Sequence, residues 1–551
     1  MTITKELIDA TTILTNGRFL TRTASTTSSF QDCMVIKGGI IQYIGSASTP
    51  TITTYKDAGV STQDLQDRYV LPGFIDGHMH FLMLGQSLQK LSLDGCKDLN
   101  EIRSRIKEFG EENPEKSRLL CRGWMHSMTN GEAKANMLEG LDEKNRPIFI
   151  DSKDLHSCWC NQAALDEMGV KYLKDPEGGS ISRDEQGNPS GLLSEAAQLV
   201  IVWPHIAKVA TMSEKTSALK AAIKAYHEVG YTGLVDMAMD ENAWEAILAL
   251  RKEKGELRMR VAAHWVIMPS TGEEARLKQV ERAIELNKEF NKQTSPDLRI
   301  VGIKVICDGV IDACTAALRE PYSNNGVSTD PIWNAEMLGP VVKKAAGAGL
   351  QCALHAIGDN AVKIAIDAIE QHAAIGKRHR IEHLELTSPE DAKRLGKLGI
   401  TASIQPVHSD PAILRAWPKL LGPDRLGRAF AYKEFADGGA AVAIGSDSPT
   451  APHAPIKNLY VATTRRSARE PGAGDAPVNE HFKIGLCEAV MAATQGAAYS
   501  CFADERVGSL EIGKKADFVV VDMEYEPGDL LKAEVKQTWF EGKMIYESQI
   551  S

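Results

Sequence analysis

The chain has 551 residues, of which 43% are hydrophobic and 25% charged, and its formal net charge is −10. This composition is typical of a folded globular protein with a sizeable core and excludes a disordered or repetitive chain. The acidic balance offers no basic face for a phosphate backbone, so we expect no nucleic-acid partner.

Both ends of the chain contain short β-type runs interrupted by Gly or Asn, at residues 11–21, 33–45, 517–523 and 537–547. Such runs predict strands, and we expect residues 1–70 and 505–551 to form one small β-sandwich domain. The N-terminal residues contain no basic leader with an apolar segment, and no stretch approaches the roughly 20 apolar residues of a membrane span. These features predict a cytoplasmic protein without a membrane partner.

Eight short apolar segments follow one another between residues 71 and 504. They cover residues 71–80, 231–237, 258–265, 301–309, 350–358, 380–386, 401–408 and 441–449. Amphipathic helical patterns separate most of them, and this β–α alternation predicts an α/β fold, a (β/α)8 TIM barrel over residues 71–504. In such a barrel we expect the active-site residues to lie at the C-terminal ends of the strands.

One long region, at about 96–215, interrupts the alternation after the first barrel strand. It contains two strand-like pieces of its own, 118–124 and 147–152, and a turn-rich stretch at 175–191. We interpret this region as an insertion over the barrel mouth.

A set of metal-ligand residue types lies at the ends of the barrel segments. His78 and His80 end the first strand, where alternation directs both imidazoles to the same side. Each candidate alone has a plain structural explanation, such as a hydrogen-bonded core histidine or a helix cap. Further candidates end the fourth, fifth, sixth and eighth segments: Lys304, His355, His383 and Asp447. Their convergence predicts a divalent metal site, and imidazole and carboxylate ligands without thiolate suit zinc, with manganese or iron as alternatives.

The motif PGFIDGHMH at 72–80, the four later ligand candidates in order, and VGSLEIGKKADFVVVD at 507–522 strongly resemble the amidohydrolase superfamily, family 3 type. Four further segments resemble the branch that contains N-substituted formamide deformylases. They are GWMHS at 123–127, HSCWCNQAAL at 156–165, GLLSEAA at 191–197 and IKVICDGVIDACTAAL at 303–318.

The resemblance implies that His78, His80 and Asp447 hold one metal ion, and that His355 and His383 hold a second ion or complete a single-ion site. It also implies that Lys304 is carboxylated and bridges two ions; an unmodified buried amine, or one paired with Asp308, is the alternative. The resemblance therefore leaves the number of metal ions, one or two, undecided.

The implied reaction is hydrolysis of a C–N bond in an amide, N-formyl or cyclic amide substrate. Asp447 would act as general base and then general acid, and His383 is the second catalytic candidate. Non-hydrolytic chemistry, such as decarboxylation or isomerisation, is the first alternative, and an inactive scaffold protein is the second.

The residues that contact the substrate are less well indicated than the metal ligands. Candidates are Trp124, His126 and His156 in the insertion, and Asp308, Tyr322 and His408 in the barrel. No arginine or lysine is clearly placed to recognise a substrate carboxylate. The expected partner is a small molecule, and a homodimer is left open.

Overall fold

The computed structural model describes residues 11–549 except 25–26, 154–156, 177–178, 271 and 475. The chain forms two compact units, which are described separately. The first consists of Met1–His80, Ile223–Asp240 and Lys254–Ser551, and the second of Phe81–Ala222 and Glu241–Glu253. Among the described residues, no helix combines the length and the apolar character needed to cross a bilayer.

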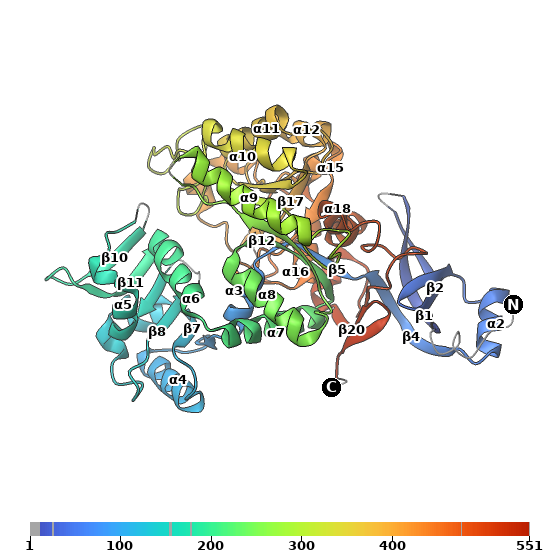
Figure 1. Cartoon of the computed structure of the whole chain (residues 1–551), viewed down its shortest axis with the longest axis horizontal. Helices are drawn as coiled ribbons and strands as arrows, with labels where there is room; N and C mark the ends of the chain where they lie inside the picture. Colours follow the sequence, from blue (N-terminus) through green and yellow to red (C-terminus); the bar gives the residue numbers. More distant parts are fainter. Residues whose placement is uncertain are drawn as a thin grey trace. The chain divides into compact units, whose positions relative to one another are not determined.

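A seven-stranded sheet in the first unit joins the two ends of the chain (Figure 1). Its strands, in spatial order, are β21 (Lys543–Glu547), β20 (Glu534–Phe540), β19 (Phe518–Asp522), β4 (Ser61–Pro72), β1 (Thr11–Ala24), β2 (Thr27–Lys37) and β3 (Ile40–Gly45). Leu14 and Phe19 of β1 share one buried cluster with Phe518 and Trp539 from the other end of the chain. Joint formation of this sheet by both termini is confirmed, whereas its folding into a sandwich stays a prediction.

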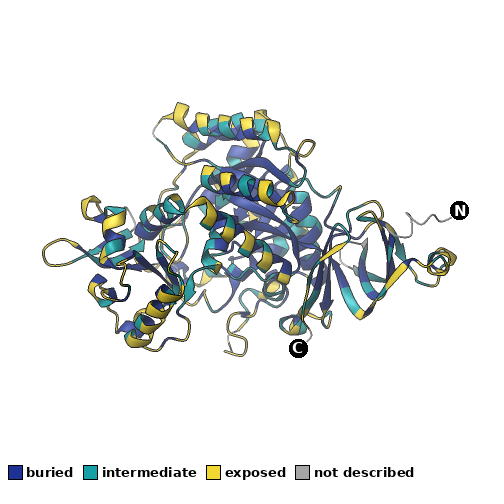
Figure 2. Ribbon diagram, turned by 60° about the horizontal axis from the view of Figure 1, so that its bottom comes forward, coloured by how far each residue is buried: buried dark blue, intermediate teal, exposed yellow. Residues whose placement is uncertain are grey.

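Eight parallel strands form the barrel of the first unit, and each of the eight predicted segments overlaps one of them. In spatial order they are β5 (Phe74–Met79), β12 (Tyr231–Met239), β13 (Arg260–Val266), β14 (Leu298–Ile306), β15 (Gln351–Ala356), β16 (Arg380–His383), β17 (Thr401–Ile404) and β18 (Val442–Ile444). The strands are almost wholly buried, as their dark blue colour in Figure 2 shows. The α/β barrel prediction is confirmed.

The seam between β18 and β5 closes the barrel without a regular ladder. The Asp447 N–H donates to the His78 carbonyl at 2.7 Å, and the His80 N–H donates to the Ser448 carbonyl at 2.9 Å. Glycine is required for this close approach, because a Cβ on Gly445 would lie 2.3 Å from the His78 nitrogen. Closure therefore places the ends of the first and last strands side by side.

Helices cover the outside of the barrel and present apolar faces to it (Figures 1 and 2). Those after β13 are α9 (Glu273–Glu289), α10 (Ala335–Gly347), α11 (Asp359–His372), α12 (Pro389–Leu398), α15 (Tyr432–Asp437), α16 (Pro455–Thr464), α17 (Leu486–Met491) and α18 (Ala497–Ser500). In α11 the buried positions Ala361, Val362, Ala365 and Ile366 recur at helical spacing, which fixes the face that packs inward.

The second unit has its own six-stranded sheet. In spatial order the strands are β10 (Gly179–Arg183), β11 (Pro189–Glu195), β9 (Ser157–Cys160), β8 (Ile148–Ser152), β7 (Leu119–Trp124) and β6 (Leu91–Ser92). The predicted strands at 118–124 and 147–152 are confirmed as β7 and β8. The turn-rich stretch is an antiparallel hairpin, β10–β11, whose turn is closed by Asp184 N–H donating to the Asn188 carbonyl at 2.8 Å. Placement of this unit over the barrel mouth stays a prediction.

Candidate metal centre

His78 and His80 converge on Asp447 at the barrel seam. One oxygen of the Asp447 carboxylate, Oδ1, lies 3.4 Å from His78 Nε2 and 3.2 Å from His80 Nε2. The three side chains thus form a compact group that could hold one metal ion. The prediction that His78 and His80 direct their imidazoles to the same side of the strand is confirmed, because both rings lie near the same Asp447 oxygen.

His383 and His355 extend this group along the carboxyl ends of β16 and β15. The ring centre of His383 lies 4.9 Å from that of His78 and 4.3 Å from that of His355. His383 and Asp447 both have positive φ angles, 77° and 55°. A non-glycine residue in this region carries a cost of about 1–3 kcal/mol, so both predicted ligands sit on strained backbone at the strand ends.

Two buried nitrogen atoms at this centre have no hydrogen-bond partner among the described residues: Lys304 Nζ and His383 Nδ1. Leaving a buried donor unpaired costs about 1–3 kcal/mol. Lys304 is 1% exposed and Asp308 does not pair with it. Several imidazoles, one carboxylate and an unpartnered amine form a donor set that fits a divalent metal ion.

The electrostatics keep the imidazoles in the form that binds metal. Burial, reinforced by the Lys304 amine, lowers the pKa of His78 to about 4 and that of His355 to about 3. Burial lowers the pKa of Lys304 to about 8. Burial alone would raise the pKa of Asp447, but the surrounding imidazoles, His78 first, hold it well below its usual range. Neutral imidazoles beside an ionised carboxylate are thus available at neutral pH.

A buried ion pair that the sequence analysis missed orients His78. Glu382 Oε2 lies 2.7 Å from His78 Nδ1, and Arg380 donates to both carboxylate oxygens of Glu382, from Nε at 2.8 Å and Nη2 at 3.0 Å. Arg380 also donates to the Gly77 carbonyl at 2.6 Å. Burial would raise the pKa of Glu382, but Arg380 and His78 lower it well below its usual range. The anion fixes the imidazole so that Nε2 faces Asp447.

His408 lies on the other side of Asp447. Its Nε2 is 3.6 Å from Asp447 Oδ2, its Nδ1 is 3.2 Å from Glu385 Oε1, and its ring stacks on His383 at 5.8 Å between centres. Burial would lower the pKa of His408, but Glu385 and Asp447 raise it overall. His408 therefore lies at the candidate centre, and its contact with substrate stays a prediction.

Asp308 and Tyr322, the other barrel candidates for substrate contact, make internal hydrogen bonds. The Asp308 carboxylate accepts from the backbone N–H groups of Ile357, Gly358 and Ala317 at 2.8–3.0 Å. Tyr322 is 1% exposed and its hydroxyl donates to the Ala316 carbonyl at 3.0 Å. Both anchor the loops that follow β14, and a direct role in substrate binding stays a prediction.

The candidates in the second unit have different surroundings. Trp124 is fully buried in that unit's core, with its ring 5.3 Å from that of Trp159 and 4.4 Å from that of the exposed His126. His156 lies outside the described residues. Their contact with substrate stays a prediction.

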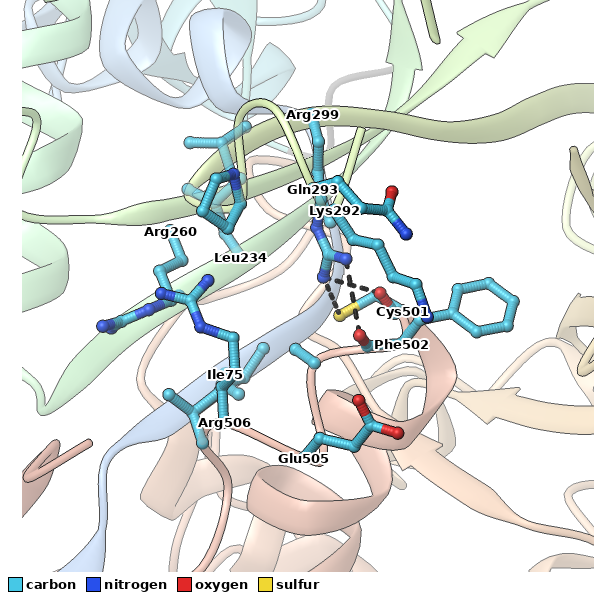
Figure 3. A pocket seen from close by; sticks show the side chains of 16 residues that line it. Ile75, Leu234, Arg260, Lys292, Gln293, Arg299, Cys501, Phe502, Glu505 and Arg506 are labelled. Carbon is cyan, nitrogen blue, oxygen red and sulfur yellow. Dashed lines mark hydrogen bonds between the residues drawn. The ribbon is translucent and has the colours of Figure 1, made fainter. Parts of the chain in front are cut away.

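A pocket of about 220 Å³ lies at the opposite end of the barrel, lined by Ile75, Leu234, Arg260 and Arg299 near the amino ends of β5, β12, β13 and β14 (Figure 3). Arg299 donates to the Cys501 carbonyl there at 2.7 Å. Since the metal-ligand candidates lie at the carboxyl ends of the strands, this pocket is separate from the candidate centre.

Comparison with known proteins identifies the family of this chain. The profile of the amidohydrolase family matches residues 61–546. The chain belongs to this amidohydrolase family. It is therefore a hydrolase by family, and the family prediction is confirmed.

Individual relatives extend the similarity over nearly the whole chain. The chain is 30% identical to Protein LONG AFTER FAR-RED 3 of Arabidopsis thaliana, covering 98% of this chain and 92% of the relative. It is 24% identical to the N-substituted formamide deformylase of Arthrobacter pascens, covering 96% and 97%. The crystal structure of an uncharacterized metal-dependent hydrolase from Pyrococcus horikoshii superposes with a TM-score of 0.78 at 25% identity, covering 94% and 98%.

Proposed function

We propose that this protein is a metal-dependent hydrolase that cleaves the C–N bond of an amide, N-formyl or cyclic amide substrate in the cytoplasm. The observation that carries the proposal is the position of Asp447. One carboxylate oxygen approaches His78 and His80, and the other faces His408. A carboxylate that contacts the ligand group through one oxygen and the His408 imidazole through the other can serve both ligation and proton transfer.

His78, His80 and Asp447, with His355 and His383, would hold the ion, and zinc is the metal that this donor set suits best. When bound, such an ion supplies a Lewis acid that polarises the substrate carbonyl and lowers the pKa of water. The unpartnered Lys304 amine, with its pKa lowered to about 8, supports the proposal that Lys304 becomes carboxylated and bridges a second ion.

The residues themselves perform the proton transfers. Asp447, whose pKa lies well below its usual range, is an ionised acceptor for the proton of the attacking water. It then delivers that proton to the leaving nitrogen, a general base and acid sequence. His408 lies where it can donate a hydrogen bond to the substrate carbonyl oxygen, because Glu385 holds its Nδ1 and leaves Nε2 directed to the centre.

Asp447→Asn tests this assignment. The amide keeps an oxygen ligand but cannot accept a proton, so we expect kcat to fall by about 10²–10⁴-fold while metal content and fold are retained. The control is Asp437→Asn, which changes an exposed carboxylate of α15 and leaves turnover intact. Near-wild-type turnover by Asp447→Asn would refute the proton-transfer role.

Loss of metal from Asp447→Asn would report ligation instead, and the acidic limb of the wild-type kcat/KM–pH profile would then test the base. The reaction class is tested by a turnover screen of N-acyl, N-formyl and cyclic amides on metal-loaded protein, with chelated protein as control. A scaffold protein would bind no metal, and a non-hydrolytic enzyme would turn over none of these amides.

A further inference from the structure

A second buried cation with unpaired N–H groups lies in the barrel unit. Arg465 directly follows α16 and is fully buried. Its Nε donates to the Val478 carbonyl at 2.8 Å, but Nη1 and Nη2 have no hydrogen-bond partner in the described part of the chain. A buried guanidinium with both terminal nitrogens unpaired is costly, so these donors are available to a ligand.

Aromatic rings, rather than carboxylates, surround this guanidinium. Its carbon lies 5.0 Å from the ring centre of Tyr432 and 5.9 Å from that of Phe430. Cation–π contact stabilises such a charge only partly. Burial lowers the pKa of Arg465, and Tyr432 is the side chain that opposes this shift. No carboxylate is among the groups that raise this pKa, so the guanidinium lacks an anionic partner among the described residues.

The aromatic rings connect Arg465 to the candidate centre. The Tyr432 hydroxyl donates to the Gln405 carbonyl at 3.4 Å, and the Phe430 N–H donates to the Glu385 carbonyl at 2.8 Å. Glu385 in turn holds His408, which faces Asp447. Arg465 is thus connected to the residues assigned to proton transfer through Phe430, Glu385 and His408 in turn.

Two more buried amides with unpaired atoms lie at the end of β17 and on α16. The amide of Gln405, the residue after β17, is buried and makes no hydrogen bond within the described residues through either Oε1 or Nε2. Asn458 of α16 accepts from the Val407 N–H at 3.1 Å, while its Nδ2 is left without a partner there. These amides and the guanidinium are buried N–H donors of the kind that pair with a carboxylate.

We propose that Arg465, assisted by the Gln405 amide, binds a carboxylate group of the substrate, so that the enzyme acts on amides that also carry a carboxylate. This inference rests on the proposed amide hydrolysis and deepens it. The guanidinium fork pairs with a carboxylate through two parallel hydrogen bonds, and low exposure strengthens the charge interaction. An uncharged amide would leave the buried cation unpaired, which gives the site its selectivity.

The first test is equilibrium binding to chelated, metal-free protein, which cannot turn the probes over. Calorimetric titration uses pairs of compounds that differ only in charge: N-acetyl and N-formyl amino acids against their C-terminal carboxamides, and dicarboxylic acid monoamides against the diamides. We expect the wild type to bind the carboxylate member of at least one pair more tightly by on the order of 10- to 100-fold.

Three variants separate the role of Arg465 from a general charge effect. Arg465→Met removes the cation and should abolish the preference, and Arg465→Lys keeps the charge without the fork and should reduce it. Arg466→Met, which removes the exposed neighbouring charge, should keep the full preference. If Arg465→Met does not fold, Arg465→Lys and Gln405→Leu decide the question by the same ratio.

The subsite is overturned if the wild type binds the carboxylate and the uncharged compound of every pair equally well. It is also overturned if Arg465→Met or Arg465→Lys keeps the wild-type preference for the carboxylate. Turnover of the same panel on metal-loaded protein separates this failure from failure of the proposed function. Hydrolysis of uncharged amides alone refutes the subsite and leaves amide hydrolysis standing. Tight carboxylate binding without hydrolysis of any amide refutes amide hydrolysis and leaves the subsite standing.

Discussion

Removing the anion that orients His78 should weaken metal binding without removing a ligand. In Glu382→Gln the side chain keeps its shape, but the 2.7 Å contact with His78 Nδ1 loses its charge. Loss of such an orienting partner typically reduces metal affinity by about 10–100-fold, or about 1.4–2.7 kcal/mol. The same change leaves the fully buried Arg380 without its counter-ion. Breaking a buried pair in this way costs about 3–5 kcal/mol of stability.

The assay is competitive zinc titration against a chelating dye, combined with melting of the metal-free protein. Asp517→Asn is the control because it removes a buried carboxylate that pairs with Arg260, while Asp297 and Glu541 still pair with that arginine. We expect both variants to melt earlier than the wild type and only Glu382→Gln to lose zinc affinity. If Glu382→Gln keeps the zinc affinity of the wild type, Glu382 does not orient His78. If Asp517→Asn loses as much zinc affinity as Glu382→Gln, the loss reflects general destabilisation.

Three other predictions concern metal, lysine and pH. Chelation should lower the melting temperature, and zinc at about 1,000 times its Kd should restore about 4 kcal/mol; an unchanged melt would argue against a built site. The Lys304 pKa falls from 10.5 to about 8 on folding, so its ammonium destabilises the metal-free protein below pH 8 and less so as the pH rises toward 10.5. Metal-free Lys304→Met should thus be more stable than the wild type by about 3 kcal/mol at pH 7 in urea unfolding, with the gain shrinking above pH 8. Burial lowers the pKa of His227 from 6.5 to about 4, so the unfolded chain takes up the proton first and stability falls as the pH drops through this range. In the wild type, this histidine should account for about 2 kcal/mol of the stability lost between pH 7 and pH 5, and His227→Gln should remove that part of the loss. If urea unfolding shows the same loss of stability in both proteins, His227 is not neutral in the folded state.

The barrel strands were predictable because each is a short, largely apolar run, and helical patterns separate most of them. β4 was not, because its sequence STQDLQDRYVLP is largely polar. This strand is stabilised by pairing with β1 on one side and β19 on the other, which only the tertiary structure provides. The β10–β11 hairpin was missed for a related reason, since its Gly- and Ser-rich strands resemble the turn that joins them.

The candidate metal ligands, which the structure brings together, were predictable from residue type and strand position, but their supporting residues were not. Arg380 and Glu382 precede His383 on one short strand, and alternation alone would direct His383 away from them. The positive φ of His383 reverses this direction, so neighbouring residues contribute to the same centre. Arg465 was hidden for a different reason: in the run TTRRSARE it looks like part of a solvated charged stretch, and only burial distinguishes it from Arg466.

The seam of the barrel links folding to the assembly of the metal centre. β5 and β18 are joined through Asp76, whose carboxylate accepts from the Ser446 N–H at 2.8 Å and from the Tyr226 hydroxyl at 2.8 Å. Two residues from Asp76 lies His78, and one residue from Ser446 lies Asp447. The hydrogen bonds that close the barrel therefore also set the separation of the first two metal ligands. A barrel that closed in another register would bring neither imidazole to Asp447, so a correctly assembled centre requires the native closure.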